Sequence, residues 1–368
     1  MALGDRYRGL PINPFGRGRH HLMIGLAAAV YSSMETVHGL IRKVAPPPER
    51  DRTLPLRVAA RQVVAHDENV VALTLTAADG GRLPRWYPGS HIDITLPSGR
   101  VRQYSLCGDP AEAGSYRIAV RRIPDGGGGS VEVHDALPVG ATVTTHGPRN
   151  AFPLTVPGYG SPTQRLRFIA GGIGITPILP MLGLADRLGV QWSMIYTGRS
   201  RDSLPFLDEV ARFGDAVRIR TDDVAGLPDA DELLGDCPDG TAVYACGPAP
   251  MLTALGARLA DHTGVELHFE RFAAPPVVDG APFAVTVAST GQTVEVGADE
   301  TLLAALTRAG VPVRYSCQQG FCGTCRTRVL DGAVDHRDLL LTDPERAAGQ
   351  MLVCISRAAG GGPLTLDL

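Results

Sequence analysis

Three cysteines stand close together near the C-terminal end of the sequence, and a fourth follows later. They are Cys317, Cys322, Cys325 and Cys354, spaced C-x4-C-x2-C with a distant fourth member. This is the plant-type spacing for a [2Fe–2S] cluster, in which four thiolates hold two irons. Gly320 and Gly323 let the backbone fold closely around the sulfurs and provide amide donors for them. The pattern predicts electron transfer.

Two other uses of cysteine compete with this interpretation. Zinc sites usually group their ligands as two short C-x2-4-C pairs, which differs from the grouping seen here. Disulfides are disfavoured because the total of seven cysteines is odd and nothing marks the chain as secreted.

A glycine-rich turn stands between a predicted strand, 166–170, and a predicted helix that runs to about Leu188. The turn reads Gly171-Gly172-Ile173-Gly174 and is followed by Thr176 and Pro177. Bare amides at a helix N-terminus favour a pyrophosphate, although the motif departs from the usual G-x-G-x-x-G dinucleotide fingerprint. Cys246 ends a later strand, at the edge of a parallel sheet where ligands bind. It is either a site residue or a small buried apolar residue.

A second candidate anion site combines a strand with a loop. The strand end Arg102-Gln103-Tyr104-Ser105 places an arginine and a hydroxyl on either side of an aromatic ring, so it suits a phosphate and a planar ring. The loop 126–129 consists of four glycines before Ser130, and its exposed amides make an anion cradle. A solvated strand surface and a flexible turn are the respective alternatives.

The length of 368 residues exceeds what one core supports, so two or three domains are expected. Short strands separated by Gly or Pro turns predict a small antiparallel barrel, with strands at 56–64, 70–77, 91–96, 101–106, 116–123, 130–134 and 141–146. From Leu166 to Glu270 strands alternate with helices, which predicts a parallel α/β sheet. A Pro-rich linker then leads to a predicted hairpin at 283–287 and 293–296.

The first 52 residues form a basic extension. They carry eight Arg or Lys against four Asp or Glu, while the whole chain has a net charge of −3. Apolar residues recur every three to four positions from Leu22 to Val44, which predicts an amphipathic helix. Such a helix docks on the body of the protein, meets a partner protein or lies on an anionic membrane surface. No run is long enough to span a bilayer and no cleavage site is evident, so we expect a cytoplasmic protein.

Taken in order, these motifs resemble the phthalate dioxygenase reductase and vanillate demethylase reductase family. The resemblance covers about residues 55 to 368 and leaves the basic extension outside. The motifs that carry it, besides the cysteine run, are Tyr104 with its neighbours, the glycine loop ending in Ser130, Gly147-Pro148-Arg149-Asn150-Ala151-Phe152, Gly171 to Pro177, Tyr196 to Arg201, Cys246-Gly247-Pro248 and Glu270-Arg271-Phe272.

The resemblance implies three domains after the extension of residues 1–52. These are an FMN-binding barrel at 53–160, an NAD-binding domain at 161–273 and, after a linker at 274–281, a plant-type ferredoxin domain with a β-grasp α+β fold at 282–368.

The resemblance also implies roles for individual residues. In the flavin site, Arg102, Ser105, Gly128, Gly129 and Ser130 hold the phosphate, and Tyr104 packs on the isoalloxazine ring. In the nucleotide site, Gly171, Gly172, Gly174 and Thr176 receive the pyrophosphate, and Cys246 lies beside the nicotinamide. Phe272 shields the flavin face. Asn150 is typical of the branch that uses FMN rather than FAD.

The implied function is a reductase that passes electrons from NADH to FMN, to the [2Fe–2S] cluster and then to a Rieske-type or haem-thiolate oxygenase. NADPH is the alternative donor because Arg199 and Arg201 follow the strand ending at Tyr196. A general NAD(P)H:acceptor reductase using FAD and a redox-sensing docking protein are the competing functions. Nothing indicates nucleic-acid binding.

Overall fold

The computed structural model describes residues 53–124, 127–155, 162–272, 276–315, 318–320, 323–338 and 340–368. The predicted helix between Leu22 and Val44 and the predicted cluster ligands Cys317 and Cys322 lie outside these residues. Among the described residues, no helix is both long and apolar enough to cross a membrane.

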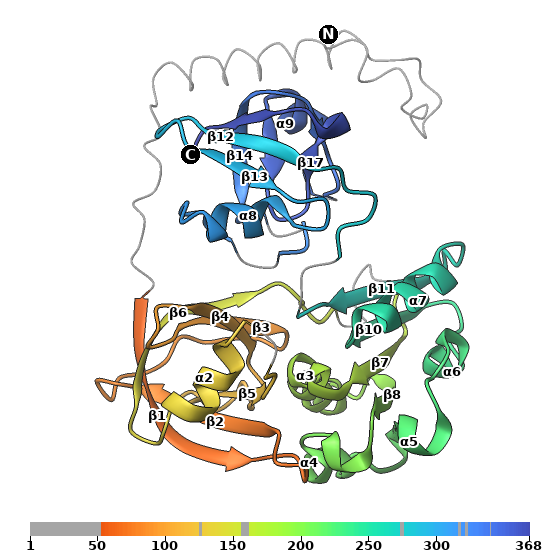
Figure 1. Ribbon diagram of the computed structural model, residues 1–368. Coiled ribbons are helices and arrows are strands. Elements are labelled where there is room, and N and C mark those ends of the chain that lie inside the picture. Colours follow the sequence, from red (N-terminus) through yellow and green to blue (C-terminus); the bar gives the residue numbers. More distant parts are fainter. Residues whose placement is uncertain are drawn as a thin grey trace, which may run out of the picture. The chain divides into compact units, whose positions relative to one another are not determined.

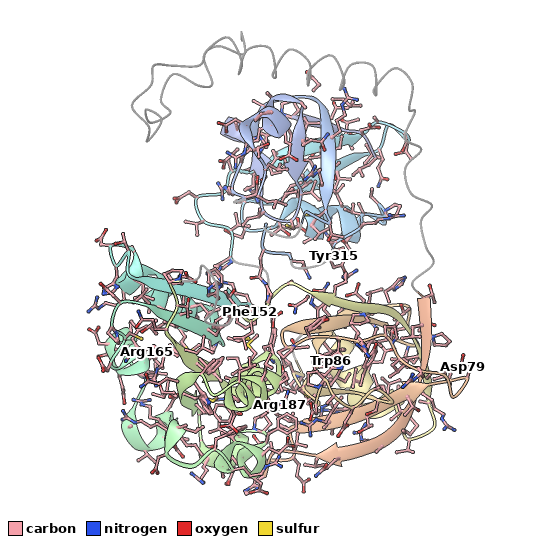
Figure 2. All side chains as sticks on the ribbon, turned by 180° about the vertical axis from the view of Figure 1, so that it is seen from behind. Asp79, Trp86, Phe152, Arg165, Arg187 and Tyr315 are labelled. Carbon is pink, nitrogen blue, oxygen red and sulfur yellow. The ribbon has the colours of Figure 1, made fainter. Side chains whose placement is uncertain are left out.

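The first domain is a six-stranded antiparallel sheet in the order β4-β3-β6-β1-β2-β5 (Figure 1). Its strands are β1 (Thr53–Val63), β2 (Val70–Ala77), β3 (Ser90–Thr95), β4 (Val101–Ser105), β5 (Tyr116–Arg121) and β6 (Thr142–Asn150). The amide of Cys107, just after β4, donates to the Arg117 carbonyl of β5 at 2.8 Å and draws the two edges together. Trp86 (Figure 2) and the apolar faces of the strands fill the core. The predicted barrel is confirmed.

One predicted strand of this domain is wrong. Residues 130–134 belong to the helix α2 (Gly129–Ala136). The alternation of Val131, Glu132, Val133 and His134 has the period of a strand, but five residues are too few to separate that period from a helical one. Val133 and Leu137, four residues apart, are both buried in the barrel core, which is the spacing of a helical face.

The second domain is a five-stranded parallel sheet in the order β11-β10-β7-β8-β9, as predicted. Its strands are β7 (Arg165–Gly171), β8 (Gln191–Gly198), β9 (Val217–Thr221), β10 (Thr241–Cys246) and β11 (Val265–Glu270). The helices between them are α3 (Ile175–Arg187), α4 (Leu207–Ala211), α5 (Asp222–Ala225), α6 (Ala230–Leu234) and α7 (Ala249–Leu259). Successive residues of β7 enter different cores. Phe168 packs with α3 on one face, and Ile169 packs with α6 and α7 on the other.

The barrel and the parallel sheet share a core. The apolar cluster around α3 also contains Ala65, Val70, Cys107 and Phe152 from the barrel. Phe152 (Figure 2) lies with its ring centroid 5.5 Å from that of Tyr244 in β10. The contact between these two domains is therefore apolar and dry at its centre.

The last domain has a five-stranded mixed sheet in the order β13-β12-β18-β14-β16. Its elements are β12 (Phe283–Val287), β13 (Thr293–Val296), α8 (Leu302–Arg308), β14 (Arg326–Asp331), β15 (Val334–Asp335), α9 (Asp343–Ala347), β16 (Gln350–Leu352), β17 (Arg357–Ala358) and β18 (Leu364–Leu366). The predicted hairpin is β12 and β13, paired antiparallel, while β12 and β18 run parallel. Four apolar residues of α8 are buried against this sheet.

Candidate functional site

The glycine loop of the barrel is packed against Arg102. A Cβ atom on Gly129 would lie 2.5 Å from Nε of Arg102, so a larger residue there would displace the Arg102 side chain. Nη2 of Arg102 donates to the Gly127 carbonyl at 2.9 Å. Gly128, with φ of 74°, precedes α2, which begins without a side-chain cap. Arg102, Gly128 and Gly129 therefore come together at an uncapped helix N-terminus, which suits a phosphate group.

Ser105 and Ser130 do not point into this cradle. Residues 102 and 105 of a strand lie on opposite faces, and the buried Ser105 hydroxyl donates to Oε2 of Glu270 at 3.2 Å. The Ser130 hydroxyl closes a turn with the Ile123 carbonyl at 3.3 Å and amide at 3.0 Å. Arg102 and Ser105 thus lie on opposite faces of β4, and their shared role at one phosphate stays a prediction.

Tyr104 shares its face of β4 with Arg102. Burial raises the pKa of Tyr104 to about 12, with the nearby Arg102 and Glu132 acting in opposite directions. The phenol therefore stays neutral, and a half-buried aromatic ring lies beside the phosphate cradle. This is the arrangement that a flavin ring with a phosphorylated side chain requires.

Three strand ends of the parallel sheet meet at its carboxyl edge. Cys246 pairs with Glu270 of β11 on one side and with Ala170 of β7 on the other. Cys246 is fully buried, and burial together with the charge of Glu270 raises the pKa of its thiol well above the usual value. Burial also raises the pKa of Glu270 to about 8, against a smaller lowering by the Ser105 hydroxyl. At neutral pH this edge carries a neutral thiol and a protonated carboxyl group.

The Gly171–Gly174 turn leaves the same edge and is shaped by its glycines. A Cβ on Gly174 would lie 2.2 Å from the Cys246 carbonyl oxygen, so the helix start can approach β10 only through glycine. Gly172 has φ of 55°. Thr176 is buried, and its hydroxyl donates to the Ile173 carbonyl at 3.1 Å, so it stabilises the turn from inside.

Arg121 is a residue of this site that sequence reasoning missed. It ends β5 of the barrel, yet its Nη2 lies 3.5 Å from the place a Cβ on Gly172 would occupy. That nitrogen donates to the Ser203 carbonyl at 2.6 Å, while the buried Nε has no partner among the described residues. Burial and then the charge of the exposed Arg199 lower the Arg121 pKa. No sequence signal near the glycine turn indicates a residue from 50 positions upstream.

Phe272 and Asn150 lie near the ends of elements that border the site. Phe272 follows β11, and its side chain is 52% exposed. Asn150 ends β6, donates to the Pro88 carbonyl at 2.9 Å and accepts from the Phe152 amide at 3.0 Å. The Asn150 side chain thus holds two loops of the barrel together.

Two of the four predicted cluster ligands are described. Cys325 precedes β14, and Cys354 follows β16; both are buried. Their neighbourhood is held by Asp338, a buried carboxylate that accepts from the Leu341 amide at 2.8 Å. A Cβ on Gly320 would lie 3.3 Å from the Cα of Asp338, so the loop carrying the cysteines packs directly on it. The close packing at Gly320 fits the tight loop that a [2Fe–2S] cluster requires.

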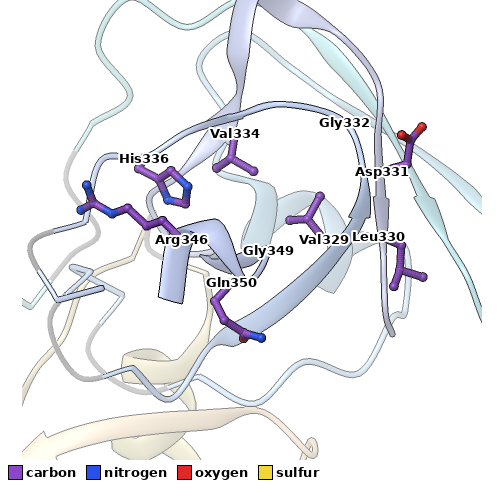
Figure 3. Close-up of a pocket in the computed structure, with 9 residues that line it drawn as sticks. All are labelled: Val329, Leu330, Asp331, Gly332, Val334, His336, Arg346, Gly349 and Gln350. Carbon is purple, nitrogen blue, oxygen red and sulfur yellow. The ribbon is translucent and has the colours of Figure 1, made fainter. Parts of the chain in front are cut away.

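The ferredoxin domain also carries a pocket of about 170 Å³ between β14, α9 and β16 (Figure 3). His336 and Arg346 line one end of it, and Asp331, the last residue of β14, lies at the other end. Nδ1 of His336 and Nη2 of Arg346 each lie 3.5 Å from a carboxylate oxygen of Asp338. None of the predicted site residues lines this pocket.

The fold and the site together define an iron–sulfur flavoprotein oxidoreductase. Residues 55–153 match the oxidoreductase FAD-binding domain model, and residues 285–359 match the 2Fe-2S iron-sulfur cluster binding domain model. A barrel with a phosphate cradle, a parallel nucleotide-binding sheet and a ferredoxin domain thus occur in one chain.

The chain matches known relatives over nearly the whole length of those relatives. The chain is 42% identical to phenoxybenzoate dioxygenase subunit beta of Ectopseudomonas oleovorans, covering 85% of this chain and 97% of that protein. It is 41% identical to vanillate O-demethylase oxidoreductase of a Pseudomonas strain, covering 84% and 98%. The chain belongs to the phthalate dioxygenase reductase and vanillate O-demethylase reductase family, and it is an NAD(P)H-dependent oxidoreductase that transfers electrons through a flavin and a [2Fe–2S] cluster.

Solved structures agree with this assignment. The structure of phthalate dioxygenase reductase is 32% identical with a TM-score of 0.65, and the match covers 88% of this chain and 100% of that one. An intact type IV self-sufficient cytochrome P450 monooxygenase is 39% identical with a TM-score of 0.66, and the match covers 88% of this chain. The chain spans only 43% of the length of that second protein.

The raised pKa of Glu270 predicts a pH dependence of stability. Its folded-state pKa of about 8 lies above the unfolded value near ~4.3, so the folded state retains a proton that the unfolded chain releases. Wild-type stability should therefore decrease as the pH rises from about 5 to 8. Glu270→Gln removes this titration, and its unfolding temperature, measured by calorimetry on the flavin-loaded chain, should vary less with pH.

Glu266→Gln is the matched control, because Glu266 lies on the same strand with a side chain that is 43% exposed. It should follow the wild-type pH profile. Parallel profiles for wild type and Glu270→Gln would show that Glu270 is ionised throughout this range.

Proposed function

We propose that this protein is the reductase component of an oxygenase system, taking hydride from NADH at an FMN and delivering single electrons through its [2Fe–2S] cluster to a terminal oxygenase. The observation that carries the proposal is the buried contact between Ser105 of the barrel and Glu270 of the parallel sheet. This hydrogen bond joins β4 of the barrel, which carries the phosphate cradle, to the carboxyl edge of the parallel sheet, which carries the glycine turn. Flavin and nicotinamide bound at these two edges would meet.

Different residues would bind different parts of the flavin. Arg102, Gly128 and Gly129 would hold the flavin phosphate, and Tyr104 would lie along the flavin ring. Ser130 supports the cradle by closing its turn. A flavin supplies the chemistry that converts a two-electron hydride donor into single electrons for the cluster. Asn150, which is typical of FMN-using relatives, supports FMN over FAD.

Around the reacting edge the chain would act by position and by hydrogen bonding. Cys246 would lie beside the nicotinamide, and Phe272 would cover the flavin face until the nicotinamide arrives. The protonated Glu270, which accepts from the Ser105 hydroxyl, would present a hydrogen-bond donor to the flavin ring. Cys325 and Cys354, with Cys317 and Cys322, would be the cluster ligands.

The nucleotide site is proposed at Gly171, Gly172 and Gly174, with Arg121 as an added cation for the pyrophosphate. Arg199 lies close enough to Arg121 for their charges to interact, and no described carboxylate forms an ion pair with either arginine. We propose NADH as the donor on family grounds, with NADPH tolerated because Arg199 could pair with a 2′-phosphate.

The partner is proposed from the relatives, which are named as a dioxygenase subunit and as an O-demethylase oxidoreductase. The basic residues 1–52 are proposed to dock on that oxygenase or on an anionic membrane surface. The alternative to an enzyme is a redox-sensing docking protein. Rapid NADH-dependent reduction of an added one-electron acceptor supports the enzyme, and its absence supports the sensor.

Cofactor extraction tests the flavin assignment. The purified chain should release about one FMN and contain one [2Fe–2S] cluster, because the cradle at Arg102 suits a single phosphate. Chromatography of the heat-released flavin, with iron and sulfide analysis, measures both. Release of FAD would overturn the assignment drawn from Asn150.

Replacing Cys322 by Ser should separate the two halves of the reaction. Hydride reduction of the flavin uses the first two domains, so ferricyanide, which takes electrons from the flavin, should still be reduced. Reduction of cytochrome c should collapse because it needs the cluster. Equal loss of both activities with flavin still bound would contradict a linear path from flavin to cluster.

Arg121→Gln should weaken NADH binding and leave the chemistry intact. The expected result is a rise of about 10- to 100-fold in the KM for NADH, with flavin reduction at saturating NADH nearly unchanged, because a charge-assisted phosphate contact is lost. Stopped-flow flavin reduction measures both quantities. Arg122→Gln is the control, since Arg122 is exposed and pairs with Asp135 at 2.6 Å. An unchanged KM in Arg121→Gln would remove Arg121 from the site.

A further inference from the structure

Two guanidinium groups face the glycines that begin α2, and the second belongs to Arg100. We propose that Arg100 is a further phosphate-binding residue of the flavin site and that Glu132 competes with the phosphate for it. This inference rests on the proposed flavin site and extends it to a residue outside the R-x-Y-S motif. It assigns to Arg100 and Glu132 opposite effects on the affinity for a flavin monophosphate.

The position of Arg100 follows from the strand. It stands two residues before Arg102 and so lies on the same face of the chain entering β4. Its Cζ is 3.7 Å and its Nη2 is 3.8 Å from the place a Cβ on Gly128 would occupy. Arg102 makes the corresponding approach to Gly129 at 2.5 Å. The two side chains therefore stand over adjacent glycines at the same helix N-terminus.

The cradle offers a phosphate few other side-chain partners. The start of α2 has no side-chain cap, and the Ser130 hydroxyl is engaged with Ile123. A phosphate monoester carries about −1.5 to −2 charges at pH 7, which exceeds the single positive charge of Arg102. A second guanidinium brings the summed charge of the phosphate and the two arginines close to zero.

Glu132 is a partner of Arg100 but has other hydrogen bonds of its own. Oε2 of Glu132 accepts from Nη1 of Arg100 at 3.3 Å, where the side chains are 49% exposed for Arg100 and 13% exposed for Glu132. The same carboxylate accepts from the Ser98 amide at 2.7 Å and from the Ser98 hydroxyl at 2.6 Å. Arg100 can therefore turn to a phosphate while Glu132 keeps two hydrogen bonds. The exposed guanidinium of Arg100 loses little free energy in this exchange.

The test compares FMN with riboflavin, which lacks the phosphate, by titrating each into flavin-depleted full-length protein at low salt. Arg100→Gln should weaken FMN binding about tenfold and leave riboflavin binding unchanged. Glu132→Gln should strengthen FMN binding severalfold, because it frees Arg100, and again leave riboflavin unchanged. The double variant should behave like Arg100→Gln. Arg85→Gln, at an exposed arginine of the same domain, should match wild type.

The competing explanation is that the Arg100–Glu132 pair only supports α2. In that case both single variants weaken FMN and riboflavin together, and the proposal is overturned. An unchanged FMN affinity in Arg100→Gln overturns it as well. If Arg100→Gln fails to fold, Glu132→Gln still decides between the two explanations, because one expects its FMN affinity to increase and the other expects it to decrease. Equal affinity of the wild type for FMN and riboflavin would refute the phosphate cradle itself, and with it the proposed FMN site on which this inference rests.

Discussion

The buried hydrogen bond between Ser105 and Glu270 is the constraint on which the site depends, because it joins two domains of different architecture at their reactive edges. The Ser105 hydroxyl can reach Glu270 only because β4 turns that face away from the phosphate cradle. Glu270 can accept this hydrogen bond only because the parallel register of β10 and β11 places it beside Cys246 at the carboxyl edge of the sheet. The shared apolar core around α3 keeps both edges dry, and burial then holds Glu270 protonated at neutral pH.

Partly buried arginines in this structure differ in their partners. Arg117 forms a bidentate pair with Glu209 at 2.8 Å, and the buried Arg220 is paired with Glu232 at 3.1 Å. Arg121 and Arg102 contact backbone carbonyls and no described carboxylate within ion-pair distance. The structural Arg357 likewise donates to backbone carbonyls. A cation without a carboxylate partner can pair with an anion, and the phosphates of the proposed cofactors would supply one at Arg102 and at Arg121.

Local patterns predicted the barrel, the parallel sheet, the hairpin and the glycine turn, because each depends on residues adjacent in sequence. The cysteine spacing likewise indicated a cluster domain, which the family match confirms. One error came from a short window, because Val131 to His134 alternates like a strand but forms a helix. Strand geometry also separates the side chains of Ser105 and Arg102, which their closeness in sequence does not show. Arg121 and Glu270 meet the site through tertiary contacts across the domain boundary, which no local pattern encodes.

A protonated Glu270 also has an electrostatic consequence for the reaction. Hydride transfer adds negative charge to the acceptor ring, and an ionised carboxylate at the same dry edge would oppose that charge strongly at low dielectric. Keeping the proton on Glu270 removes this repulsion and leaves the carboxyl group able to donate a hydrogen bond. The buried thiol of Cys246 is neutral for the same reason. The reacting edge of the proposed site is therefore uncharged, and the arginines proposed to bind the cofactor phosphates, Arg102 and Arg121, lie against the two glycine turns.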